Sequence, residues 1–422
     1  MTNLIGGLFK WMAFDKDISK TVKNSGYYLG SSIIGIALSF ISFPVYAVLL
    51  TKEQFGILAF FAAAGSILTP FSILSLTNFY VVRSGQLSTE AREKLLQDLV
   101  VFNFYWNCLL IIIGGVILYF YLRLTGSRID FFPNAPLMFI ILTTQSFISF
   151  KSIEYRMSGD GLKFFLLQTA QVTGNVVLGV SFVWFFDAGA TGKLAGIGLS
   201  NLLIAMVFGY GLMAKATRPD LKLVISGLRE MKELTFASFL HSTVPSADVM
   251  VLETYNNLAG LGVYNVGKQI ANFVSMAGAS LFQAFEPKLY QDFRKNQVSK
   301  SPNFRLFVLA NIFLILLYFV FSDWIIAILT AGRFYDSLQY SNLLVFQAFS
   351  VTVIQALQIK LFLQRKVKLL AIVNIFGSAI AFALVFPLTN AFLFTGAAVT
   401  FVISSATQLI VFGVLTRLYG RS

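Results

Sequence analysis

Charged side chains are scarce in this sequence. Only 12% of the 422 residues are Asp, Glu, Lys or Arg, whereas 57% are hydrophobic. A soluble chain of this size carries charge on about a quarter of its residues in order to solvate its surface. The scarcity excludes a soluble globular protein and predicts an integral membrane protein.

Cysteine and histidine occur once each, as Cys108 and His241. A single cysteine excludes an intramolecular disulfide and a cysteine-ligated zinc or iron–sulfur centre. A single histidine argues against histidine-ligated metal catalysis. The segment 262–269 is close to a phosphate-binding loop, but Gln269 replaces the Ser or Thr that binds magnesium. We therefore expect no enzymatic activity, no metal and no cofactor.

Long apolar runs are what the sequence has in abundance. A helix of about 20 apolar residues crosses about 30 Å of hydrocarbon. Twelve such spans are predicted, at 26–50, 56–82, 98–122, 136–154, 164–186, 194–214, 234–254, 262–286, 304–321, 338–363, 369–388 and 393–416. The seventh is the least apolar, because His241, Pro245 and Asp248 interrupt it. Apolar residues run continuously instead of alternating, so the fold class is an all-α polytopic membrane protein.

Basic side chains are distributed unequally between the predicted loops. The side that holds the N-terminus has 25 Lys and Arg, the opposite side has 5, and Lys268 and Lys360 fall inside spans. Basic loops stay in the cytoplasm, so both chain ends are predicted to be cytoplasmic. The net charge of +13 is then a topology signal, and we expect no nucleic-acid partner.

The twelve spans divide into two halves of six. We expect a first bundle at 1–214, a cytoplasmic linker at 215–233 and a second bundle at 234–422. The first twenty residues form either a helix in the membrane interface or a disordered tail. Short matches about 200 residues apart, such as Gly56-Ile57 with Gly262-Val263, suggest a parallel repeat. Alternating-access transporters commonly have such repeats, with the substrate site between the halves.

Ionisable residues inside spans are candidates for function, because each costs several kcal/mol in hydrocarbon unless it is paired or hydrated. Asp248 and Lys268 lie at similar depth in adjacent antiparallel spans, so they form a structural ion pair or line a hydrated cavity. One face of the eighth helix carries a polar stripe that includes Lys268. The predicted cavity residues are Lys268, Asn265, Asn272, Ser275, Arg83 and Asn78, and the predicted ion-coupling residues are Asp248, His241 and Glu286.

Four segments resemble a known family. They are Leu50–Ile57, Gly262–Lys268, Phe285–Leu289 and Gly332–Ser337. With these segments the chain resembles the O-antigen-type polysaccharide flippases of the multidrug/oligosaccharidyl-lipid/polysaccharide (MOP) exporter superfamily. The resemblance implies two six-helix bundles in a V, with spans 1, 2, 7 and 8 lining a central cavity.

The resemblance also implies a function. Such a protein moves an undecaprenyl-diphosphate-linked oligosaccharide across the bacterial inner membrane, coupled to H⁺ or Na⁺, and works with polysaccharide polymerase and chain-length proteins. Lys268 would bind the anionic diphosphate, and titration of Asp248 would couple the ion gradient to the conformational change.

Other transporters remain as alternatives. A multidrug antiporter of the same superfamily would share the fold. Such antiporters resemble one another in having an acidic residue in the cavity of the first half, whereas the first two spans here lack a buried carboxylate. A major-facilitator transporter would need a Gly-Asp-Arg-rich loop between the second and third spans, which is missing here. A membrane polymerase or ligase would need a large outer loop with catalytic residues, and the longest outer loop is around 322–337.

Overall fold

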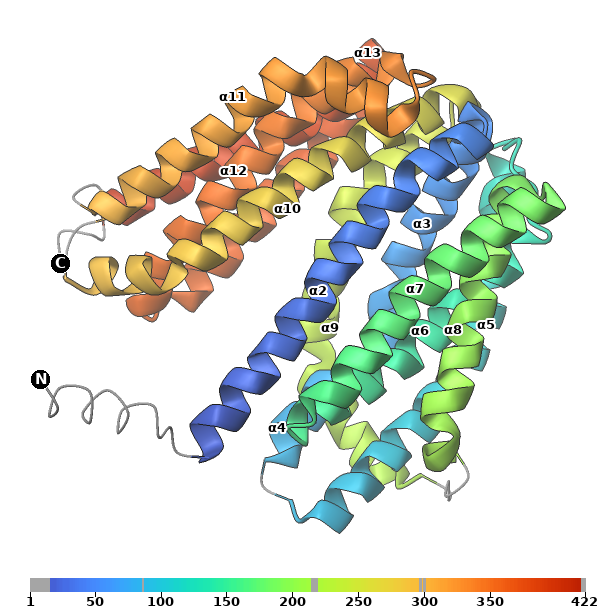
Figure 1. Cartoon of the computed structure of the whole chain (residues 1–422), viewed down its shortest axis with the longest axis vertical. Coiled ribbons are helices and arrows are strands. Elements are labelled where there is room, and N and C mark those ends of the chain that lie inside the picture. Colours follow the sequence, from blue (N-terminus) through green and yellow to red (C-terminus); the bar gives the residue numbers. More distant parts are fainter. Residues whose placement is uncertain (1–15, 86, 214–218, 296–297, 299–300, 419–422) are drawn as a thin grey trace, which may run out of the picture. The chain divides into compact units, whose positions relative to one another are not determined.

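The computed structural model describes residues 16–85, 87–213, 219–295, 298 and 301–418, and within these residues the chain forms helices and no strand (Figure 1). Residues 1–15 of the predicted N-terminal interfacial segment and residues 215–218 of the predicted linker lie outside the described residues, whereas residues 16–20 begin α2. The helices are α2 (Lys16–Leu49), α3 (Lys52–Ile73), α4 (Leu76–Ser84), α5 (Thr89–Leu124), α6 (Asn134–Met157), α7 (Gly161–Phe186), α8 (Gly189–Met213), α9 (Leu221–Glu253), α10 (Leu258–Lys295), α11 (Pro302–Thr330), the 3₁₀ helix η2 (Tyr335–Ser337), α12 (Leu338–Leu363) and α13 (Val367–Leu418).

Each of the twelve predicted spans falls on helical structure, but length and hydropathy do not confirm the number twelve. Among the described residues, nine helical segments are long and apolar enough to cross a bilayer. The eleventh and twelfth predicted spans both lie in α13 and count there as one segment. Helices α9 and α10 are long enough but too polar, as expected from Asp248 and Lys268.

Two of the long apolar segments are broken by backbone geometry. Leu74 and Ser75 both have a φ of 52°, a left-handed conformation that ends α3 before α4 begins. Leu393 has a φ of 49° and a ψ of −129°, so α13 consists of two helical parts. The predicted second span, 56–82, is therefore two helices, and α13 breaks at the first residue of the predicted twelfth span, next to the predicted loop.

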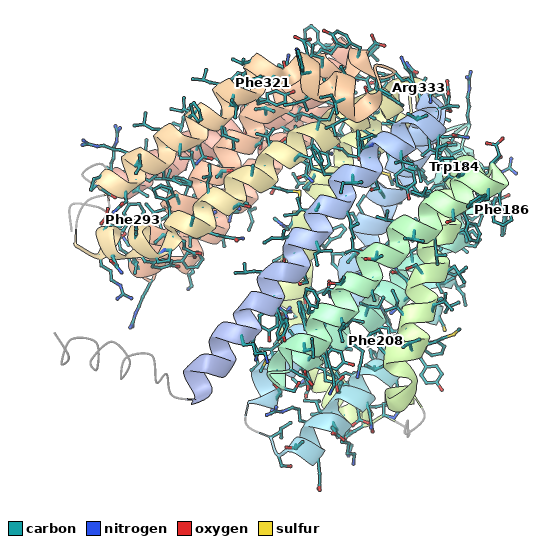
Figure 2. The ribbon with its side chains drawn as sticks, viewed as in Figure 1. Trp184, Phe186, Phe208, Phe293, Phe321 and Arg333 are labelled. Carbon is teal, nitrogen blue, oxygen red and sulfur yellow. The ribbon has the colours of Figure 1, made fainter. Side chains whose placement is uncertain are left out.

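Large apolar side chains cover the outside of the helices. Trp184 and Phe186 on α7 are 64% and 70% exposed, and Phe321 on α11 is also exposed (Figure 2). A water-soluble protein does not expose such continuous apolar surface. Lipid tails solvate this surface, so the chain is a multi-pass membrane protein.

The helices group into two compact units. Unit 1 takes the described residues of Met1–Val45, Leu68–Phe120 and Phe131–Phe239, and unit 2 takes those of Tyr46–Ile67, Tyr121–Asp130 and Leu240–Ser422. Four helices, α2, α3, α5 and α9, contribute to both units.

Unit 1 combines an apolar core with an internal polar cluster. Phe79, Leu99 and Phe150 are buried where α4, α5 and α6 meet. Nearby, the Ser72 hydroxyl donates to Asn107 at 2.6 Å, and Asn103 donates to the Ser72 carbonyl at 2.6 Å. Because these polar groups satisfy one another, they join helices in a setting that has no water to bind them.

Unit 2 is built around α10, α11, α12 and α13, which run together in Figure 1. Phe293, Phe307 and Phe412 are among the residues buried in its core. The N-terminal turns of α3 and α10 meet backbone to backbone. A Cβ on Gly262 would overlap the carbonyl oxygen of Lys52, and one on Gly56 would overlap that of Leu258. Only glycine allows this approach.

Candidate functional site

Lys268 and Asp248 form an ion pair inside unit 2. The Lys268 Nζ on α10 lies 2.9 Å and 2.7 Å from the two carboxylate oxygens of Asp248 on α9. The Asp248 side chain is 0% exposed, whereas the Lys268 side chain is 28% exposed. The sequence placed these residues at one depth, and the structure brings them into contact, with the carboxylate inside and the ammonium nearer the surface.

Two further groups satisfy the buried carboxylate. The Tyr264 hydroxyl, one turn before Lys268, donates to Asp248 Oδ2 at 2.7 Å. The backbone N–H of Val249 donates to Oδ1 at 2.8 Å. A buried carboxylate is stable only when its lone pairs are matched in this way. Asp248 therefore has several charge-stabilising contacts.

Pro245 connects the ion pair to the local shape of α9. Lys268 Nζ also donates to the Pro245 carbonyl at 2.5 Å. Proline has no N–H, so the carbonyl of His241 four residues earlier lacks its usual helical donor. The proline thus removes one backbone hydrogen bond from α9 next to the point where Lys268 contacts the helix.

A cavity of about 340 Å³ lies next to this pair, between α9, α12 and α13. His241, Val244 and Pro245 line it from α9. Its other polar lining consists of five carboxamides and three hydroxyls. These are Gln347, Gln355, Gln358, Asn374, Gln408, Ser378, Ser404 and Ser405. Within the described part of the chain the lining includes no Asp, Glu, Lys or Arg.

The cavity and the ion pair share two residues. Pro245 lines the cavity and accepts a hydrogen bond from Lys268. Phe401 also lines it, and the Lys268 ammonium lies 5.4 Å from the centre of the Phe401 ring, within cation–π range. A cationic group and a neutral polar cavity are therefore neighbours on one compact unit.

The remaining predicted residues of α10 do not join this cluster. Asn265 and Ser275 are half-buried and Asn272 is exposed, and none makes a side-chain hydrogen bond within the described residues. Glu286 is 18 residues after Lys268, which is about 27 Å along a helix. Glu286 therefore lies far from the ion pair along α10.

Arg83 and Asn78 belong to unit 1, on α4. Arg83 donates to Glu230 at 2.8 Å, and its guanidinium lies 5.5 Å from the Phe79 ring centre. Both partners of this pair are more than 40% exposed, so the pair contributes little to stability. Asn78 is exposed.

The amide face of the cavity was missed in the sequence. Gln355 and Gln358 follow Gln347 by 8 and 11 residues, which are close to two and three helical turns. The three residues thus lie on one face of α12. The prediction from sequence considered charged residues within the spans and did not use this pattern of amides. The α13 residues come from 374–378 and 401–408, on opposite sides of the break at Leu393, and no local pattern predicts their meeting.

Solved structures share this fold. The lipid II flippase MurJ in an inward closed conformation matches with a TM-score of 0.71 and 11% identity, over 93% of this chain and 86% of that one. A variant of the MATE transporter VcmN from Vibrio cholerae matches with a TM-score of 0.55 and 15% identity, over 94% and 98%. An inward-facing multidrug resistance MATE transporter of the MOP superfamily has a TM-score of 0.55 and 16% identity, over 94% of each chain.

Sequence comparison gives the family. Among curated proteins nothing matches. A family model described as "Polysaccharide biosynthesis protein" matches residues 21–291, which is more than half of the chain. The resemblance to polysaccharide exporters of the MOP superfamily is confirmed at the level of family and fold. The chain therefore belongs to the polysaccharide biosynthesis protein family.

Proposed function

We propose that the chain is a flippase that moves an undecaprenyl-diphosphate-linked oligosaccharide, a repeat unit of O-antigen or a related surface polysaccharide, from the cytoplasmic to the outer leaflet of a bacterial inner membrane. The observation that carries this proposal is the match of residues 21–291 to a polysaccharide biosynthesis family. The fold shared with a lipid II flippase supports a lipid-linked cargo.

The chemistry of such a cargo fits the residues of unit 2. The polyprenyl tail stays in lipid, whereas the diphosphate and sugars need a polar route through the hydrocarbon. Lys268 offers a cation for the diphosphate, and the neighbouring cavity offers amides and hydroxyls for the sugars.

The unequal exposure of the ion pair suggests how ion binding and cargo are coupled. The diphosphate reaches the half-buried Lys268 and competes with the buried Asp248 for its ammonium. Protonation of Asp248, or Na⁺ binding to it, weakens its hold on Lys268 and so changes the affinity of this site for the diphosphate. The ion gradient thereby acts on cargo affinity, which is the differential binding that an alternating-access cycle needs.

The test is transport by the purified chain in liposomes. A fluorescent lipid-linked oligosaccharide in the inner leaflet should become accessible to an impermeant glycosidase faster with the protein than without it. An imposed H⁺ or Na⁺ gradient should increase this rate. The Lys268→Met variant should lose most transport, while Lys288→Met, which changes an exposed cation on the same helix, should not. Equal rates in liposomes with and without protein would contradict the proposal.

Export of cationic drugs is the second candidate, favoured by the shared MATE fold. Cations are best held by a carboxylate, but Asp248 is already neutralised by Lys268 and the adjacent cavity has a neutral lining. Drug-resistance assays separate the two functions, because an antiporter lowers drug accumulation in cells and a glycan flippase does not.

A further inference from the structure

The cavity beside the ion pair has unused hydrogen-bonding capacity. Within the described residues, Gln347, Gln355 and Gln408 make no side-chain hydrogen bond, and Gln358 makes only a long one, at 3.5 Å to Asn374. Each amide has two N–H donors and an acceptor oxygen. Half-buried amides that face a cavity and have no protein partner remain available to a polar ligand, so these groups favour a ligand rich in hydroxyls.

The serines of the cavity differ from the amides. The hydroxyls of Ser378, Ser404 and Ser405 already donate to backbone carbonyls, at 3.0, 2.8 and 3.1 Å. Their oxygens retain lone pairs and can accept hydrogen bonds. The lining as a whole therefore presents donors from the amides and acceptors from both amides and hydroxyls. Neighbouring hydroxyls on a sugar ring, each a donor and an acceptor, match this arrangement.

Charge and size narrow the class of ligand. The described lining has no formal charge apart from any proton on His241, so it does not select an anion or a metal ion. The volume of about 340 Å³ falls at the small end of ligand pockets. It holds on the order of ten waters, which is the scale of a single sugar ring. The exposed His241 and Asn374 leave the cavity open for entry.

The position of the cavity relative to Lys268 gives it a role in the proposed transport. Pro245 and Phe401 form a shared wall between the cavity and the Lys268 ammonium. In a lipid-linked glycan the diphosphate is attached directly to the first sugar, so an anionic group and a neutral ring are neighbours there too. We propose that the amide-lined cavity between α9, α12 and α13 binds one neutral sugar ring of the cargo, close to its diphosphate.

This inference rests on the proposed function for its choice of cargo, but it can be tested without transport. In the Cys108→Ala background, Gln355→Cys places a single thiol in the cavity of the full-length protein. Glucose, galactose and N-acetylglucosamine, each at millimolar concentration, should slow alkylation of this thiol by N-ethylmaleimide at least threefold. Galacturonate should protect less, because the lining offers no cation. A Ser127→Cys control in the α5–α6 loop, which does not line the cavity, should react at one rate throughout.

Failure of every neutral sugar to protect Gln355→Cys, or equal protection at Ser127→Cys, would overturn the inference, whatever transport shows. Protection without glycan transport would keep the sugar site and remove the flippase. In the liposome assay, Gln355→Leu and Gln408→Leu should each reduce transport about two- to tenfold, the value of one or two hydrogen bonds. The control Gln339→Leu, an exposed amide on α12, should not. Matching thermal unfolding midpoints for these variants would confirm that folding is unchanged.

Discussion

At the scale of single residues, Lys268 and Asp248 form an ion pair whose two side chains differ in exposure. The carboxylate is fully buried and receives hydrogen bonds from Lys268, Tyr264 and the Val249 N–H. The ammonium is partly exposed and also bonds the Pro245 carbonyl. Loss of the cation would leave a buried negative charge, whereas loss of the anion would leave a cation that retains an acceptor and access to polar surroundings.

This asymmetry predicts unequal effects of substitution on stability. Lys268→Met should lower the free energy of unfolding by about 3–5 kcal/mol, the typical cost of breaking a buried pair. Asp248→Asn should cost less, because it leaves no buried charge. The double variant should recover most of the stability lost in Lys268→Met. Thermal unfolding of the four proteins in detergent measures this, and equal losses in the two single variants would contradict the asymmetry.

The double variant also separates stability from transport. If it is folded and as stable as the wild type but does not flip the glycan, the charges serve transport. A double variant that transports at the wild-type rate would show that the pair is purely structural.

At the scale of elements, the start of α10 is held against the start of α3 by glycines. The backbone of Gly262 packs against the Lys52 carbonyl, and the backbone of Gly56 packs against the Leu258 carbonyl. Side chains at these points would force the two helices apart. The same region carries Tyr264 and Lys268, so this contact also positions the ion pair along α10.

Gly262→Ala should therefore destabilise the protein by about 1–3 kcal/mol through overpacking. The matched control is Gly413→Ala in α13, where an added Cβ meets nothing within 4 Å. Alanine in that helical position should stabilise the protein by up to about 1 kcal/mol. Unfolding midpoints that fall for Gly413→Ala or stay constant for Gly262→Ala would be inconsistent with this packing.

At the scale of the whole molecule, the number of membrane crossings depends on α9 and α10. Nine described segments satisfy length and hydropathy, and α13 supplies two of the predicted spans in one segment. Helices α9 and α10 are 33 and 38 residues long, so length permits both to cross. Their polar residues pair with one another, which lowers the cost of placing them in hydrocarbon.

Cysteine accessibility tests this topology. In the Cys108→Ala background, single cysteines at Ser88 and Ser158 should react with an impermeant thiol reagent from the cytoplasmic side. Cysteines at Ser127, Asp187 and Thr254 should react from the outer side. Thr254 lies between α9 and α10 and is the decisive position. It lies on the outer side if the two helices cross the membrane and on the cytoplasmic side if they do not. The loops before α9 and after α10 lie on the same side in both cases. Labelling of Thr254→Cys from the cytoplasmic side would show that α9 and α10 do not cross.

The sequence by itself determined the helical membrane class. In lipid every span must be apolar and helical, and each span meets this requirement within its own stretch of chain. Long apolar runs must form helices, and Asp248 and Lys268 stand out because charges in hydrocarbon are costly. The break at Leu74 and Ser75 and the amide-lined cavity were decided only by the tertiary structure. The cavity needs Gln347 and Gln355 from α12, His241 from α9 and two separated parts of α13. Their meeting depends on how helices pack, and neutral amides leave little trace in hydropathy or charge.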